Sequence, residues 1–339
     1  MNPRNPKLEP ITPEEAKQMY LEARKREVSQ STLDGYHYRL KHFIRWCNGP
    51  GNIDNMNDLS GRDLQQFRTW RRDDGDLKPI TLEGNLDALR VFLRWCESID
   101  AVREGLHDKS IMPALSKEEE RSRAILRAER AEEILDYLRQ FEYASRGHVV
   151  MEVLWETGMR LGALHALDIA DYNPDEQYLE VTHRPETDTP LKNGNEGERL
   201  VALSTRLCEV LTGGIERQRP GVKDSFGREP LIASSRGRAA KSCIRDTVYK
   251  VTRPCYYGEK CPADHDPCPT GYGSYSKCPM SVSPHAVRRG SITHHLSKDV
   301  PEKVVSDRMN VGPDVLDKHY DGRSERQKVE QRRGFLDNI

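Results

Sequence analysis

The chain lacks any hydrophobic run long enough to cross a membrane. Charged residues make up 32% of its 339 positions and hydrophobic residues 36%, and no window approaches the roughly 18 consecutive apolar residues that a membrane span needs. The N-terminal segment 1–7 also lacks the apolar core of a secretory signal. These absences exclude an integral membrane protein, so the sequence predicts a soluble, cytoplasmic protein with no membrane partner.

An excess of charge of either sign is also missing, because the formal net charge is -1. Binding to DNA draws much of its free energy from neutralised phosphates, so a neutral total lowers the expectation of a nucleic-acid partner. The distribution of charge matters more than the sum, and basic runs at 24–26, 71–72 and 288–289 could gather on one face. Any single run is more typical of a solvated helix face. A DNA partner therefore stays open at this stage.

The length predicts two domains, since single domains usually hold about 100–200 residues. Residues 1–110 read as four helices, with N-terminal capping sequences at Thr12, Ser31 and Ser60. Apolar residues recur at helical spacing after these starts. The segment 43–47 is echoed by 92–96, each with an aromatic pair and a cysteine. This pattern predicts a small helical bundle with shared aromatic anchors.

A second domain is expected over residues 124–325, after a linker at 111–123 where the apolar periodicity lapses, and before a charged tail at 326–339. Its helical pattern is interrupted by two alternating segments, 178–182 and 198–203, which are typical of a β-hairpin. Lys192 lies in the loop between them. The expected fold class is mostly α (α+β): a helical bundle followed by a mainly helical domain with a small antiparallel sheet.

One group of residues suggests phosphate chemistry. Ser283 and Pro284 favour a helix start, so His285 and Arg288, three positions apart, would share the first turn, where free N–H groups attract anions. Tyr320 would lie in the last turn of a short helix opened by Pro313. With Arg160 from far upstream, two guanidinium groups could hold one phosphate while the tyrosine attacks it.

Cysteines fall into two groups. Cys255, Cys261, Cys268 and Cys278 lie within an insertion at 253–280 that is rich in Pro, Gly and Tyr. Four thiolates satisfy tetrahedral zinc, although the usual C-x2-C spacing is missing. We therefore expect either a structural zinc site or free thiols in this insertion. The remaining four cysteines are scattered and are typical of small buried hydrophobic residues.

These motifs resemble a known family. H-x-x-R at 285–288, T-G-x-R at 157–160, Thr293-His294 and D-x-x-Y-D at 317–321 are similar to the tyrosine recombinases of the phage-integrase and Xer type. Segment 311–320 looks most similar to archaeal integrases.

The resemblance implies an N-terminal SAM-like DNA-clamping bundle and a site-specific recombinase or integrase that forms a 3′-phosphotyrosine without ATP or a catalytic cofactor. Its partners would be double-stranded DNA with inverted core sites and three further copies in a homo-tetramer. The implied catalytic residues are Arg160, Lys192, His285, Arg288 and Tyr320, with Lys192 as the general acid.

The chain departs from the family pattern at two positions. The family usually has Glu or Asp three residues after the first arginine, where this chain has Ala163, and His or Trp nine residues before the tyrosine, where it has Val311. Asn310 could substitute as the hydrogen-bond donor or could be uninvolved. Two alternatives stay open: a type IB topoisomerase-like enzyme that nicks and closes strands, or a catalytically weak, zinc-stabilised DNA-binding regulator.

Overall fold

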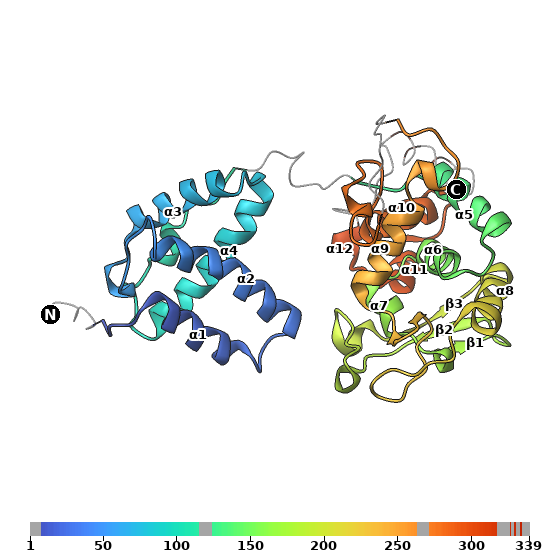
Figure 1. Ribbon diagram of the computed structural model, residues 1–339, viewed down its shortest axis with the longest axis horizontal. Helices are drawn as coiled ribbons and strands as arrows, with labels where there is room; N and C mark the ends of the chain where they lie inside the picture. The colour runs from blue at the N-terminus through green and yellow to red at the C-terminus, as the bar shows by residue number, and fades with distance from the viewer. Residues whose placement is uncertain are drawn as a thin grey trace. The chain divides into compact units, whose positions relative to one another are not determined.

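A computed structural model describes residues 8–114, 124–262 and 271–316, together with Arg326, Val329 and Arg333. The chain divides into two compact units with a boundary between residues 123 and 124, which Figure 1 shows. Helices dominate and the sheets are small and antiparallel, so the predicted mostly α (α+β) class is confirmed. Within the described ranges, no helix is long and apolar enough to cross a membrane.

In the described part of the N-terminal unit there are four α-helices, as the sequence predicts, and their bounds are α1 Pro13–Arg24, α2 Gln30–Cys47, α3 Gly61–Asp74 and α4 Pro79–Ser98. Capping boxes at Thr12 and Ser60 begin α1 and α3. The N-cap of α2 is Ser29, two residues before the predicted cap Ser31. The reason is that Ser29 is extended and its hydroxyl accepts a hydrogen bond from the Thr32 N–H at 3.3 Å.

Aromatic side chains from α2, α3 and α4 fill the centre of this unit. The Phe43 ring lies edge-on to Phe67, with 5.4 Å between the ring centroids, and edge-on to Phe92, with 6.4 Å between them. The Trp46 ring also lies edge-on to Phe67, at a centroid distance of 5.7 Å. Such edge contacts stabilise a core beyond the area they bury. The echo between segments 43–47 and 92–96 therefore does mark two helices that share aromatic anchors.

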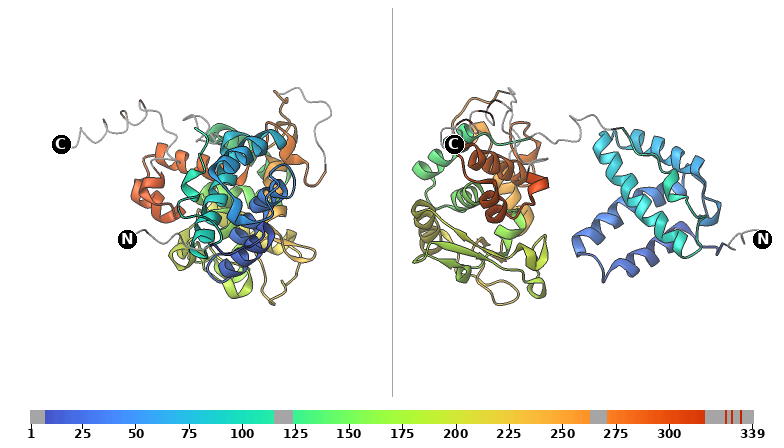
Figure 2. Two further views of the ribbon diagram at one scale, coloured as in Figure 1. Left: turned by 90° about the vertical axis from the view of Figure 1, so that its left-hand side faces the viewer. Right: turned by 180° about the vertical axis from the view of Figure 1, so that it is seen from behind.

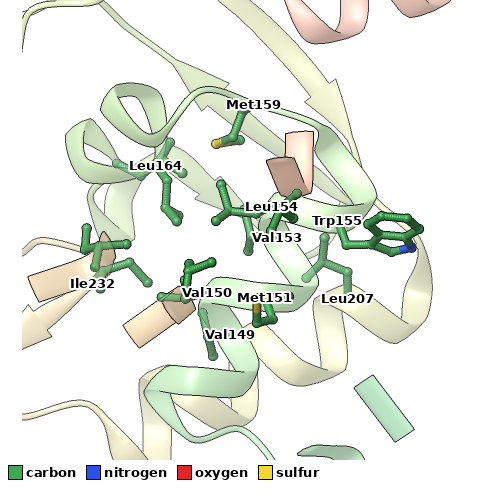
Figure 3. Packing of buried hydrophobic residues seen from close by; sticks show 14 of the residues in the cluster. Val149, Val150, Met151, Val153, Leu154, Trp155, Met159, Leu164, Leu207 and Ile232 are labelled. Carbon is green, nitrogen blue, oxygen red and sulfur yellow. The ribbon is translucent and has the colours of Figure 1, made fainter. Parts of the chain in front are cut away.

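The C-terminal unit is built around one central helix. Its helices are α5 Ala128–Phe141, α6 Arg146–Thr157, α7 Leu161–Ala166, α8 Thr205–Gly213, α9 Lys241–Val251, α10 Pro284–Ser297, α11 Glu302–Met309 and α12 Pro313–Val315. Helix α6 contacts α5, α8, α9 and α10. Figure 3 shows its apolar side chains between Val149 and Trp155 packed with Met159, Leu164, Leu207 and Ile232. Helix α6 is buried on all sides from His148 to Trp155, and its one buried acid, Glu152, pairs with Arg139 and His148.

The strands of this unit lie along one of its edges (Figure 2). They are β1 Tyr172–Asn173, β2 Tyr178–Val181, β3 Arg199–Ala202, β4 Ala233–Ser234 and β5 Gly237–Arg238. Strand β2 pairs antiparallel with β3, with Leu179 opposite Val201, which confirms the predicted hairpin. The sequence did not indicate β1, β4 or β5, because a strand of two residues has no measurable alternation.

Helix α10 approaches the segment before α5 at a glycine. The N–H of Leu126 donates to the Ala286 carbonyl at 3.1 Å. A Cβ atom placed on Gly290 would lie 1.9 Å from the Leu126 carbonyl oxygen, which is backbone and cannot rotate away. Only glycine therefore permits this approach, which fixes the position of the helix that carries His285 and Arg288.

Candidate phosphate-binding site

The segment T-G-x-R is a helix end followed by a new helix start. Thr157 closes α6: its hydroxyl donates to the Val153 carbonyl at 2.6 Å and accepts from the Met159 N–H. Gly158 adopts the left-handed conformation with φ of 57°, which glycine favours at helix ends. The chain then turns so that Arg160 becomes the N-cap residue of α7. Gly158 and Arg160 therefore both lie at the junction between α6 and α7.

Arg288 is almost completely buried, with 1% of its surface exposed, and it binds the ends of two helices. Its Nη1 donates to the Gly158 carbonyl at 2.6 Å, at the end of α6, and to the Met309 carbonyl at 2.7 Å, at the end of α11. The last carbonyls of a helix lack partners within the helix and carry its negative dipole end. Two helix ends therefore stabilise this buried cation without neutralising its charge.

Arg160 converges on the same place. Its Nη1 donates to the Asn310 carbonyl at 2.8 Å, and Nη2 of Arg288 lies 3.4 Å from that same oxygen. Asn310 ends α11 in the left-handed conformation, with φ of 50°, which aims its carbonyl back at the two arginines. The structure therefore brings together two predicted site residues that are 128 positions apart in the sequence.

Two further arginines belong to the cluster, and no motif in the sequence points to either. Arg199 in β3 donates from Nε to the Arg308 carbonyl at 2.8 Å and from Nη1 to the Gly197 carbonyl at 2.8 Å. Burial and the positive charges of Arg288, Arg160 and Arg308 lower the pKa of Arg199 to about 10. The field at this site is therefore strongly positive, which is the environment that attracts a phosphate.

His285 lies in the first turn of α10, on its exposed side. Ser283 caps this helix as predicted, its hydroxyl accepting from the Ala286 N–H at 3.3 Å. The pKa of His285 lies below its ordinary value, first because the crowded site removes part of its hydration and then because Arg289, Arg288 and Arg160 are positively charged. The imidazole is therefore mainly neutral at pH 7.

We expect the pKa of His285 to rise when a phosphate binds beside it. The arginines disfavour the protonated imidazole, and a bound anion offsets their charge, so the titration midpoint should move up. NMR titration of protein with labelled histidine, with and without a short DNA duplex, measures this change, and His285→Gln identifies the resonance. A midpoint that stays constant or falls on binding contradicts the placement of a phosphate here.

Lys192 is exposed, on the loop between β2 and β3, and that loop is attached to Asn310. The side-chain amide of Asn193 donates to Asn310 Oδ1 at 2.6 Å, and Nδ2 of Asn310 donates to the Glu196 carbonyl at 3.0 Å. The residue that accepts from Arg160 and Arg288 through its backbone therefore also holds the lysine loop through its side chain.

Ala163 and Val311, the two departures from the family pattern, are both buried, at 7% and 4% exposure. Val311 packs in a small apolar cluster with residues of α10 and α11 and with Leu316, the residue after α12. Tyr320 and its D-x-x-Y-D segment lie outside the described residues. The helix predicted to lead to it does begin at Pro313, which is the first residue of α12.

The cysteine insertion does not form a metal centre in the part of the chain that the structure describes. Cys255 is exposed, Cys278 is buried, and Cys261 lies between these extremes; Cys268 lies outside the described residues. Among residues with described positions, no group of three or more His, Cys, Asp or Glu side chains could hold a metal ion. The three described cysteines thus do not supply a preformed zinc site.

The chain matches two protein-family models. Residues 124–310 match the model of the phage integrase family, and residues 18–98 match the phage integrase N-terminal SAM-like domain. Tyrosine recombinase XerC of Mycobacterium sp. (strain KMS) is 24% identical over 301 residues, which cover 84% of this chain and 85% of the relative. XerC of Natranaerobius thermophilus is 22% identical over 276 residues, which cover 80% of this chain and 81% of the relative.

Solved structures share the fold at low identity. The Tn1549 transposon integrase in complex with transposon right end DNA has a TM-score of 0.69 and 13% identity, covering 95% of this chain and 99% of that one. A lambda integrase dimer bound to a COC′ core site has a TM-score of 0.62 and 17% identity, covering 93% and 79%.

Proposed function

Since the chain belongs to the phage integrase family, we propose that it is a site-specific tyrosine recombinase that cleaves and rejoins double-stranded DNA through a 3′-phosphotyrosine intermediate without ATP. The observation that carries this proposal is the convergence of Arg160 and Arg288 on the Asn310 carbonyl, in a field to which Arg199 and Arg308 add positive charge. The Gly158, Met309 and Asn310 carbonyls that accept from these guanidinium groups are uncharged, so they position the groups without neutralising them.

Each side chain has a distinct role in the proposed reaction. Arg160 and Arg288 bind the non-bridging oxygens of the scissile phosphate and stabilise the charge that grows there in the transition state. His285, mainly neutral before DNA binds, orients the phosphate and transfers protons. Tyr320 is the nucleophile and Lys192 the general acid; the family resemblance supports both roles.

The proposed reaction keeps the energy of the phosphodiester bond in a covalent link to the protein. The Tyr320 hydroxyl gives its proton to the neutral His285 imidazole as its oxygen forms a bond to phosphorus, and the bond from phosphorus to the 5′ oxygen breaks. That oxygen takes a proton from the Lys192 ammonium and leaves as a 5′ hydroxyl. Attack by a 5′ hydroxyl reverses these steps, and the strand is rejoined. No cofactor takes part, because the covalent link to tyrosine retains the energy of the original bond.

Asn310 also has a proposed role, as the donor that replaces the missing His or Trp. One of its two amide hydrogens is engaged by the Glu196 carbonyl. The second amide hydrogen of Asn310 is the one that would donate to the phosphate.

Trapping on a suicide substrate tests the proposal. On a nicked duplex, cleavage releases a short fragment with a free 5′ hydroxyl, and once this fragment diffuses away the protein should stay covalently attached to the DNA. In a second assay, two intact duplexes should exchange strands. We propose that exchange takes place in a homo-tetramer on inverted core sites in the cytoplasm, and mass photometry of the synaptic complex would detect four protomers. Relaxation of supercoils without exchange would indicate the topoisomerase alternative, and specific binding without an adduct would indicate the regulator.

Zinc in the cysteine insertion is a separate proposal, supported by the clustering of Cys255, Cys261, Cys268 and Cys278 in the sequence. Its role would be to stabilise the insertion, not to take part in strand transfer. We expect elemental analysis of the purified protein to find about one zinc per chain. Absence of zinc together with four thiols that titrate in the native protein would contradict it.

We also propose, from segment 311–320 alone, that the chain is nearer to archaeal than to bacterial integrases.

A further inference from the structure

The loop that carries Lys192 is fixed to the end of α11 at two places. The first is the Asn193–Asn310 side-chain hydrogen bond at 2.6 Å, supported by the bond from Asn310 Nδ2 to the Glu196 carbonyl at 3.0 Å. The second is Arg199, which donates to Gly197 in the loop and to Arg308 in α11. Leu191 at the base of the loop is buried in the core, but Lys192, Asn193, Asn195 and Glu196 at its tip are exposed, so these bonds help to determine the position of the tip.

Asn310 contacts both parts of the proposed machinery. Its backbone carbonyl accepts from Arg160 at 2.8 Å, and its Oδ1 accepts from Asn193 and lies 3.4 Å from Arg160 Nη1. One residue therefore connects the guanidinium groups that would hold the phosphate with the loop that would deliver the proton. A chain of short hydrogen bonds of this kind transmits position, because each bond tolerates only small changes in length and angle.

We propose that Asn193 and Asn310 are positioning residues that set the Lys192 ammonium against the 5′ oxygen of the scissile phosphate. The inference rests on the proposed function, in which Lys192 is the general acid. Without the tether, the loop moves independently of the arginines and the ammonium is displaced from the leaving oxygen. A displacement of about 1 Å costs roughly 100-fold in rate.

The substitutions follow from the backbone of each residue. Asn310→Gly deletes the side chain but keeps the left-handed conformation, because glycine adopts φ of 50° without strain, and so keeps the carbonyl that accepts from Arg160. Asn193→Ala deletes the other half of the tether. Asn195→Ala is the matched control: it removes an exposed asparagine from the same loop, for which the described structure records no side-chain hydrogen bond.

A substrate with sulfur in place of the bridging 5′ oxygen separates positioning of the acid from general damage. When its phosphorus–sulfur bond breaks, the sulfur leaves as a thiolate, which is stable without a proton, whereas a departing 5′ oxygen needs one. Cleavage of the sulfur substrate is therefore independent of Lys192. Single-turnover cleavage of both substrates is measured for the wild type, Lys192→Ala, Asn193→Ala, Asn310→Gly and Asn195→Ala, with thermal melting and DNA binding as checks of folding.

We expect Asn193→Ala to cleave the oxygen substrate about 10- to 100-fold more slowly than wild type and the sulfur substrate at nearly the wild-type rate, with Asn195→Ala unchanged on both. Asn310→Gly should lose more on the oxygen substrate than on the sulfur substrate, because it removes both the tether and the proposed amide donor to the phosphate. Equal loss by Asn193→Ala on both substrates overturns the inference, because this asparagine would then support the site as a whole. If sulfur does not restore cleavage by Lys192→Ala, the acid assignment fails, whereas restoration of Asn193→Ala would still show that Asn193 positions a proton donor.

Discussion

Replacing Tyr320 with Phe should abolish the covalent adduct between protein and DNA while leaving DNA binding intact. The substitution removes one oxygen, which in the proposed reaction is the atom that bonds to phosphorus, and it keeps the aromatic ring. Loss of a nucleophile commonly lowers the rate by about 10⁴-fold or more. Denaturing gel electrophoresis after incubation with a suicide substrate measures the adduct, and a mobility-shift titration measures binding.

Tyr272→Phe is a matched control for this experiment. Tyr272 is 71% exposed and lies in the cysteine insertion, so the same chemical change there should leave adduct formation unaltered. An adduct that persists at the wild-type level in Tyr320→Phe would mean that another side chain attacks the phosphate. In that case the order of motifs along the sequence would have indicated the family correctly but the nucleophile wrongly.

Substitution of Arg288 should have the second largest effect. Arg288→Ala removes a guanidinium that contacts both helix ends, and we expect cleavage to fall by about 100- to 1,000-fold, as for other fixed charges that stabilise a transition state. It also leaves the Gly158 and Met309 carbonyls buried without this donor, at a cost of about 1–3 kcal/mol each at most. Arg288→Lys keeps the charge but lacks the planar fork, so it should restore cleavage only in part.

Stability and catalysis are distinguished by measuring single-turnover cleavage at saturating DNA, at a temperature where circular dichroism finds each variant folded. Arg245→Ala provides the control, since Arg245 is an exposed residue on α9 outside the cluster. Full cleavage by Arg288→Lys would show that charge alone is needed and that the fork geometry is incidental.

Local signals in the sequence predicted much of what positions the site. The Ser283-Pro284 start of α10 and the bundle of α1–α4 depend on neighbours a few residues apart, which capping and periodicity describe. The hairpin around Lys192 was visible for the same reason. The start of α2 was misplaced by two residues because Ser29 and Ser31 offer similar hydroxyls, and the backbone decides which one caps.

Features that depend on tertiary contacts were not accessible in this way. Arg199 and Arg308 belong to the positive cluster through bonds to carbonyls about a hundred residues distant, and nothing in their own neighbourhood marks them. Asp168 likewise forms salt bridges with two arginines that are distant in the sequence. Its Oδ2 lies 2.6 Å from Arg228 Nε and its Oδ1 lies 2.5 Å from Arg238 Nη2. Such pairs arise from packing of the finished fold, which a single sequence does not encode in any short window.

The contacts of Arg288 with carbonyl groups affect how strand cleavage should depend on pH. Amide oxygens do not take up protons in the range where carboxyl groups do, so acidification cannot release this guanidinium from Gly158 and Met309 as it would release an arginine anchored by aspartate or glutamate. Loss of strand cleavage at low pH should therefore be traced to ionisations elsewhere, with the anchoring of the arginine unchanged.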